Sequence, residues 1–293
     1  MAHDPASLPR EPAAKGALRL LGRCGLAAAL ACGDPSLALG APQERIPDFS
    51  SAANVAWQSR SPTGLDPSSS GPQPVTVDPV IFPKEHPYDM DTSFPVLDLT
   101  NPNLQPWVVE RLKTQNEHVL AGQPLHAVSS SCWPHGLPAY MRYNGPTFII
   151  QSANEVVILK NQSSEVRRVA LNKAHSPNPK PSWYGESVGH YENGDTLVID
   201  TIGLNDRTYV DLFRTPHTTA LHVIERWKLS ADGKAIDLRA RVEDPGAFKA
   251  PYEVTKHYTK VETPWLEVAC AENPIGPVYQ GLDPIPQAET PDF

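Results

Sequence analysis

One carboxylate, Glu225, lies in a segment that is otherwise apolar on one side. In the run ALHVIERWKLS, residues 220–230, strand-like alternation places Val223, Glu225 and Trp227 on the core-facing side. A carboxylate in such surroundings is costly to ionise, so its pKa rises unless a cation or several donors satisfy it. Enzymes use such groups as general acids or bases. The alternative is a structural ion pair with an inward-facing arginine, such as Arg168.

Three further ionisable residues could serve with Glu225 in proton transfer. His190 and His217 carry imidazoles, which exchange protons near neutral pH. Asp200 ends the apolar run TLVID and is expected to be half-buried at one rim of the scaffold. The predicted catalytic residues are therefore His190, Asp200, His217 and Glu225. For each histidine, the alternative is a structural residue that bonds to the backbone.

The motifs of several common enzyme classes are absent. The sequence has no Gly-x-Ser-x-Gly elbow, phosphate-binding glycine loop, dinucleotide fingerprint or His-Glu-x-x-His motif. His217 and His222 are five residues apart, which places them on opposite faces of a strand and argues against a shared metal. A site from His175, His190 and His217 is possible, but the spacing does not support it. We expect neither a metal nor a cofactor.

Two cysteines are expected to form a disulfide. The chain has four cysteines, Cys24, Cys32, Cys132 and Cys270, and removal of a leader would leave the last two. A bond between Cys132 and Cys270 would close a loop of roughly 140 residues and contribute about 4 kcal/mol in the chain-entropy model. The alternatives are two separate buried thiols, or Cys132 as a nucleophile.

The first 41 residues resemble an export signal. Lys15, Arg19 and Arg23 form a basic region, residues 25–33 form a short apolar region, and small residues follow at 38–41. The alternative is a disordered alanine-rich leader. Export predicts a periplasmic or secreted protein, which agrees with a disulfide.

The elements that must position these residues are mostly strands. Residues 42–90 are rich in Pro, Ser and Gly and are expected to be a disordered linker. Residues 91–273 are expected to form one β-rich domain, and 274–293 an irregular tail. A helix is expected within 103–122, with Asn103 as its cap and Pro106 in its first turn. Strands are expected near 147–152, 155–160, 166–171, 196–201, 220–229, 235–242, 252–260 and 266–270.

This pattern predicts a mainly β fold. About eight short strands joined by tight turns indicate an antiparallel barrel or sandwich, lipocalin-like in architecture. A parallel βαβ fold is disfavoured because no helical pattern separates the strands.

Charge and hydropathy limit the partners. The 293-residue chain has a net charge of −8, and its Lys and Arg residues are scattered singly, so a nucleic-acid partner is not expected. No apolar run approaches the roughly 20 residues that span a bilayer. The expected partner is a small organic molecule, and the sequence does not indicate an oligomeric state.

Several motifs are typical of one group of proteins. They are CWPHGLP at 132–138, SVGHYENGDTLVIDT at 187–201, NDRT at 205–208 and CAEN at 270–273. Together they resemble a family of exported bacterial proteins catalogued as hypothetical, and the resemblance covers about half of the chain. It implies no activity. The sequence departs from the family pattern at residues 218–219, Thr-Thr, where the pattern has Ser followed by a carboxylate.

Three classes of function remain. The first is an exported enzyme, a lyase, isomerase or hydrolase, that transfers protons on a small molecule in a barrel or inter-sheet pocket. The second is a periplasmic small-ligand-binding β-barrel without chemistry. The third is a structural or interaction module, in which the buried polar residues are satisfied ion pairs.

Overall fold

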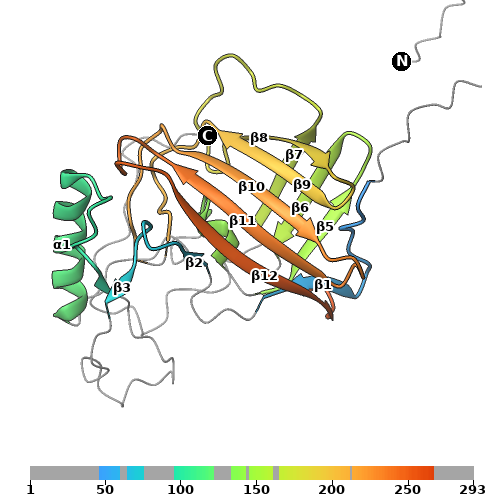
Figure 1. The fold of residues 1–293 in the computed structure, drawn as a ribbon, viewed down its shortest axis with the longest axis horizontal. Coiled ribbons are helices and arrows are strands. Elements are labelled where there is room, and N and C mark those ends of the chain that lie inside the picture. Colours follow the sequence, from blue (N-terminus) through green and yellow to red (C-terminus); the bar gives the residue numbers. More distant parts are fainter. Residues whose placement is uncertain are drawn as a thin grey trace, which may run out of the picture. The chain divides into compact units, whose positions relative to one another are not determined.

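The structure is a computed structural model, and it describes seven stretches of the chain (Figure 1). These are residues 46–59, 65–75, 96–121, 133–142, 145–160, 165–211 and 213–266. Several expectations concern residues outside these stretches: the leader at 1–41, the tail at 274–293, the Cys132–Cys270 disulfide and most of the strand at 266–270.

Nine strands close into a β-barrel (Figure 1). They pair in the order β1-β5-β6-β7-β8-β9-β10-β11-β12, and β1 pairs back with β12 to complete the ring. The expected mainly β barrel with one helix is confirmed. The strands are β1 (Val55–Gln58), β5 (Thr147–Gln151), β6 (Glu155–Lys160), β7 (Glu165–Leu171), β8 (Glu186–Glu192), β9 (Thr196–Ile202), β10 (His222–Leu229), β11 (Ala235–Glu243) and β12 (Tyr252–Glu262).

The barrel is mixed rather than purely antiparallel, and it has more strands than expected. Strand β7 pairs with β8 in parallel, with Ala170 opposite Val188 and Leu171 opposite Gly189. The segment 172–185 makes this possible, because it carries the chain back to the end of the barrel at which β7 begins. A tight turn would have given an antiparallel neighbour instead. Strand β8 was not expected, because its glycine and charged residues mask the apolar alternation.

Part of the expected linker at 42–90 forms strands. Besides β1, it contains β2 (Asp66–Pro67) and β3 (Pro74–Val75), and β3 pairs with β4 (Val96–Leu97). Strand β2 lies against β12. The linker prediction is therefore wrong over these strands. Composition could not reveal them, because each is very short and depends on a distant partner for its hydrogen bonds.

Strand β1 closes the barrel through Trp57. This residue lies opposite Lys260 of β12 and Thr147 of β5. Its side chain is fully buried, and the indole Nε1 donates a hydrogen bond to the Phe49 carbonyl at 2.8 Å. Burial of an aromatic ring compensates for the short length of the strand.

The helix α1 (Pro106–Leu120) lies within the expected range, but it begins at Pro106, two residues later than a cap at Asn103 would place it. Gln105 occupies the cap position and makes no side-chain cap bond. The Asn103 side chain instead donates to the Ser70 and Ala250 carbonyls, each at 2.9 Å, so it joins two loops. No helix in the described part of the chain is long and apolar enough to span a membrane.

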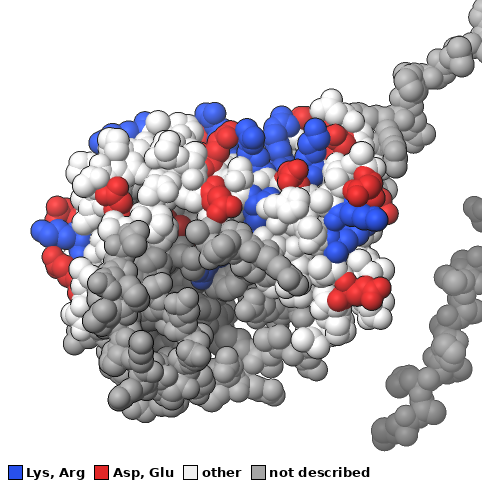
Figure 2. Space-filling view, turned by 60° about the horizontal axis from the view of Figure 1, so that its bottom comes forward, with Lys and Arg blue, Asp and Glu red and all other residues white. Residues whose placement is uncertain are grey.

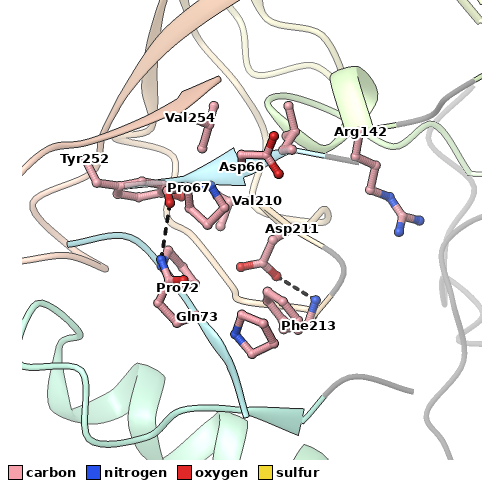
Figure 3. Close-up of a pocket in the computed structure, with 12 residues that line it drawn as sticks. Asp66, Pro67, Pro72, Gln73, Arg142, Val210, Asp211, Phe213, Tyr252 and Val254 are labelled. Atoms are coloured by element: carbon pink, nitrogen blue, oxygen red, sulfur yellow. Dashed lines mark hydrogen bonds between the residues drawn. The ribbon is translucent and has the colours of Figure 1, made fainter. Parts of the chain in front are cut away.

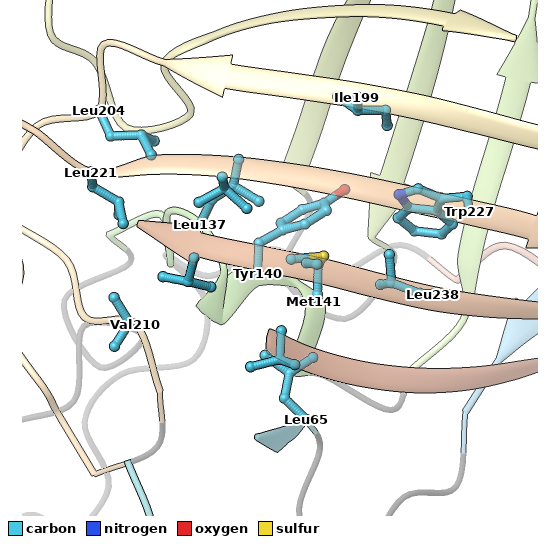
Figure 4. Packing of buried hydrophobic residues seen from close by; sticks show 14 of the residues in the cluster. Leu65, Leu137, Tyr140, Met141, Ile199, Leu204, Val210, Leu221, Trp227 and Leu238 are labelled. Atoms are coloured by element: carbon cyan, nitrogen blue, oxygen red, sulfur yellow. The ribbon is translucent and has the colours of Figure 1, made fainter. Parts of the chain in front are cut away.

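The barrel interior is filled by side chains (Figure 4). Tyr140 and Met141 come from the short 3-10 helix Ala139–Arg142, and Leu137 precedes that helix. All three side chains have almost no exposed surface. These pack with inward-facing residues of the strands, such as Trp227, into one hydrophobic cluster. Any ligand site must therefore lie at an end or a side of this cluster.

Candidate functional site

Glu225 lies on the inner face of β10, as predicted, and it is fully buried. Its carboxylate forms a bidentate ion pair with Arg167 of β7: Nη2 lies 2.6 Å from Oε1 and Nη1 lies 3.0 Å from Oε2. The indole Nε1 of Trp227 donates to Oε2 at 3.0 Å. Both oxygens are thus held by donors, which is the geometry of a structural ion pair.

The inward arginine is Arg167, not Arg168. Alternation along β7 turns Glu165, Arg167 and Val169 inward and Arg168 outward. The Arg168 side chain is 75% exposed, and its Nε lies 2.5 Å from Glu155 Oε1. The Arg167 guanidinium also donates to the hydroxyls of Ser187 and Thr201, at 3.2 and 2.8 Å.

The inward-facing residues of β9 are Leu197, Ile199 and Thr201, so Asp200 lies on the outer face of the barrel. Its Oδ1 accepts from two imidazoles, His175 Nε2 at 3.0 Å and His222 Nε2 at 2.8 Å. His175 Nδ1 also contacts Glu186 Oε1 at 3.0 Å. Among the described residues, no group of three or more His, Cys, Asp or Glu residues is suited to hold a metal ion.

His190 is exposed on the outer face of β8. Its Nε2 lies 2.9 Å from Glu192 Oε1, and Arg226 binds the other oxygen of the same carboxylate at 2.6 Å. Along the upper part of the surface in Figure 2, Lys and Arg side chains lie beside Asp and Glu side chains. The exposure and the contacts of His190 are those of an ordinary surface residue.

His217 is buried in the loop before β10. Its Nδ1 lies 3.0 Å from the Thr218 carbonyl, which can only accept, so Nδ1 carries a proton. Nε2 lies 2.9 Å from the Thr208 hydroxyl. Burial lowers the pKa of His217, and the opposing effects of the Thr218 carbonyl and Asp244 are smaller. The neutral ring then accepts the Thr208 proton, so both nitrogens have structural partners.

The structure therefore places the four predicted residues in four different surroundings. Glu225 is inside the barrel, Asp200 and His190 are outside it with different partners, and His217 is in a loop. No hydrogen bond or ion pair between described residues joins any two of them.

Sequence reasoning missed a second buried polar group, formed by His135, Glu165 and Tyr184. Glu165 Oε1 accepts from the backbone N and the ring Nδ1 of His135, both at 2.8 Å. Burial raises the pKa of Glu165, but the hydrogen bonds and charge of His135 outweigh it and bring the pKa below the ordinary value. Burial and the Glu165 charge raise the pKa of Tyr184. Alternation along β7 could have shown that Glu165 faces inward.

Lys160 is also buried inside the barrel, at the end of β6. Its Nζ donates to the Thr147 hydroxyl at 2.6 Å and lies 5.3 Å from the ring centroids of both Tyr140 and Tyr258. Burial lowers the pKa of Lys160 to about 7, against the attraction of Glu165 and Glu225. Among the described residues, one hydroxyl and two aromatic faces thus take the place of water around this amine.

A pocket lies where the start of β12 meets β2 and the loop after β9 (Figure 3). Its volume is about 200 Å³. Polar groups come from Asp66, Gln73, Arg142 and Asp211. Most of the wall is apolar, from Leu65, Pro67, Pro72, Pro74, Val210, Phe213, Tyr252 and Val254.

The Asp211 carboxylate is held by its own loop. Oδ1 accepts from the backbone amides of Phe213 at 2.9 Å and Thr215 at 3.0 Å, which is an Asx-type turn. Val210 N donates to the Thr215 carbonyl at 3.0 Å and closes the loop. Asp211 is half-buried as a whole, and its Oδ2 is shielded from solvent.

Figure 3 shows how this carboxylate is directed. Asp211 and Phe213 lie on one side of the pocket, Pro72 and Tyr252 lie on the other, and the oxygen not bonded to Phe213 points toward Pro72. Burial raises the pKa of Asp211, and the hydrogen bond from the Thr215 side chain, the two amide hydrogen bonds and the Arg142 charge only partly oppose the shift. This pocket combines a cavity, a mostly apolar wall and a few polar side chains.

No protein-family model matches the chain, and no curated protein is significantly similar to it.

Proposed function

We propose that the protein binds a small organic molecule in the pocket beside Asp211. The observation that carries the proposal is a cavity of about 200 Å³ with a mostly apolar wall and a few polar side chains in its lining. Concave apolar pockets with a few directed polar groups are the usual form of small-molecule sites.

The size of the pocket suits a single ring. A cavity of roughly 150 Å³ lined by apolar side chains can hold benzene. Lipocalin-like barrels carry their ligands in the barrel interior, but here Leu137, Tyr140 and Met141 fill the centre. The proposed ligand therefore lies at the side of the core, against the first residues of β12.

The proposal is tested with benzyl alcohol as a probe. We expect saturable binding to the full chain, seen as perturbed backbone resonances or a raised melting temperature. Val210→Phe fills the pocket and should weaken binding at least about tenfold, with Ile150→Phe on the exposed outer face of β5 as the matched control. If the probe does not bind, or binds Val210→Phe as well as the wild type, the proposal is wrong.

An acid–base enzyme is the second candidate, and Asp211 favours it. A carboxyl whose pKa is raised by burial can exchange a proton closer to neutral pH. The expected reactions remain those of a lyase, isomerase or hydrolase. Metabolite profiling with the wild type and Asp211→Asn separates the two: an enzyme loses turnover but keeps binding, whereas a binder shows no turnover in either protein.

We also propose that the protein is exported to the periplasm or secreted. The proposal rests on the basic and apolar regions within residues 1–41. Sequencing the N-terminus of the protein from each cell fraction tests it. Cleavage near residue 41 in an extracytoplasmic fraction is expected, and an intact N-terminus in the cytoplasm would contradict it.

A further inference from the structure

We infer that an open groove on the outer face of β10, β11 and β12 binds a small phosphorylated polyol, such as a sugar phosphate. These three strands lie side by side in the barrel wall (Figure 1). The groove has a volume of about 660 Å³. It differs from the pocket beside Asp211, although Asp66 borders both, so the inference does not depend on the proposed function.

Two arginines in the lining of the groove face each other across neighbouring strands. Strand register places Arg226 of β10 directly opposite Arg239 of β11. Both side chains point away from the core, because the adjacent residues Trp227 and Leu238 are the buried ones. Like charges directly opposite each other on adjacent strands are destabilising. An anion bound between the two guanidinium groups would remove this repulsion.

The carboxylates beside these arginines use only part of their hydrogen-bonding capacity. Within the described part of the chain, the Arg226 side chain donates one hydrogen bond, from Nη1 to Glu192 Oε2 at 2.6 Å. The Arg239 side chain donates one long hydrogen bond, from Nη1 to Glu253 Oε2 at 3.4 Å. A guanidinium has five N–H donors, so both arginines keep donors for a ligand. Their planar fork matches the oxygens of a phosphate.

The charge of the lining favours a phosphate over a carboxylate. A phosphate ester carries a charge of about −1.5 to −2 at pH 7 and three acceptor oxygens, so it can balance both arginines at once. A single carboxylate has one charge and two oxygens, and it would leave one guanidinium unbalanced. Lys228, two residues after Arg226 and on the same strand face, lines the groove as a third cation.

The other lining residues favour a neutral ligand body that carries hydroxyl groups. Asp237 lies opposite Lys228, and Asp66 lies opposite Thr255 at the border of the groove. These carboxylates would repel a ligand that is anionic along its whole length, but they can accept hydrogen bonds from hydroxyls. A groove of this volume is in the range of small-molecule sites, so it has room for such a body beside the phosphate.

Three probes separate these properties. Glucose 6-phosphate has the phosphate and the polyol, glucose has the polyol alone, and citrate has several negative charges without a phosphate. Each is titrated into the full chain at neutral pH and constant ionic strength, with the backbone amide and arginine Nε resonances of β10 and β11 as the readout. We expect saturable, millimolar binding of glucose 6-phosphate, because the groove is open to water, and binding at least about fivefold weaker for the other two.

Substitutions connect the binding to the opposed arginines. Arg226→Gln and Arg239→Gln should each weaken the binding of glucose 6-phosphate roughly fivefold, the upper end for an exposed charge pair. The matched control is Arg168→Gln, because Arg168 is also an exposed arginine that pairs with a carboxylate, but it lies on β7 outside the groove. This control should bind glucose 6-phosphate as the wild type does. The melting temperature of each variant without ligand checks that it is folded.

The outcomes separate a binding groove from an ordinary surface network of ion pairs. If glucose 6-phosphate leaves the resonances of β10 and β11 unchanged, or binds the Arg226→Gln and Arg239→Gln variants as tightly as the wild type, the inference is wrong. If citrate or glucose binds as tightly as glucose 6-phosphate, the inference is also wrong, because the groove then does not select the phosphate. None of these results affects the pocket beside Asp211, which is tested with benzyl alcohol.

Discussion

The buried pair of Arg167 and Glu225 makes a strong prediction about stability. The Glu225→Gln substitution keeps the shape of the side chain but removes the charge that balances the guanidinium. Arg167 would then keep only neutral acceptors among the described residues: the amide oxygen of the new side chain and the hydroxyls of Ser187 and Thr201. Breaking one side of a fully buried pair costs about 3–5 kcal/mol.

The size of the effect in a melting experiment follows from the size of the domain. In domains of roughly 150–250 residues, each kcal/mol changes the melting temperature by about 2–4 °C, so Glu225→Gln should lower it by roughly 6–20 °C. Circular dichroism or calorimetry on the full chain measures this. The matched control is the neighbouring exposed pair, where Glu155→Gln should have little effect because its partner Arg168 is 75% exposed.

A double variant tests whether the loss of stability comes from the unbalanced charge of Arg167 rather than from the loss of the Glu225 side chain itself. Arg167→Met combined with Glu225→Leu removes both charges and leaves apolar side chains of similar size, so much of the lost stability should return. Two results would refute the argument: a Glu225→Gln protein that melts within about 2 °C of the wild type, or a double variant less stable than either single one.

Two further predictions concern backbone and charge. Burial lowers the pKa of Lys160 to about 7, so the unfolded chain binds more protons than the folded one between about pH 7 and 10. The urea midpoint of the wild type should therefore rise with pH in that window, and Lys160→Met should reduce the rise while the exposed Lys228→Met should not. Gly136→Ala should destabilise the protein more than Gly233→Ala. Both glycines have positive φ, which alone costs alanine about 1–2 kcal/mol, but only at Gly136 would a Cβ lie 2.4 Å from the Thr208 hydroxyl oxygen. Equal midpoints for the two alanine variants would contradict the crowding at Gly136.

Much of the barrel could be predicted from sequence, because its long strands alternate clearly. The expected strand at 155–160 matches β6, and β9, β11 and β12 differ from expectation by a few residues at most. The inner face of β10 was also predicted, including Glu225. The parallel pairing of β7 and β8 could not be predicted, since it depends on the path of the chain through 172–185 rather than on any local pattern.

The partners of the buried charges and the residues of the pocket were harder to predict, because they also depend on which distant segments the fold brings together. The partner of Glu225 was misassigned to Arg168, although the alternation that placed Val166 and Arg168 on one face was visible in the sequence. The pocket has no signal of this kind. Asp211 comes from a loop, Arg142 from a 3-10 helix and Pro72 from a segment that composition marked as linker. Only closure of the barrel brings these parts together, so no spacing in the sequence encodes them.

The position of β1 has a consequence for synthesis of the chain on the ribosome. Gln58 and Thr259, which face each other across the barrel seam, are 201 residues apart. At roughly 5–20 residues per second, β12 is translated about 10–40 s after β1. During that interval the nascent sheet has open edges, which are prone to pair with other chains. A chaperone that shields the emerging polypeptide would act in this interval, before the last strand completes the ring.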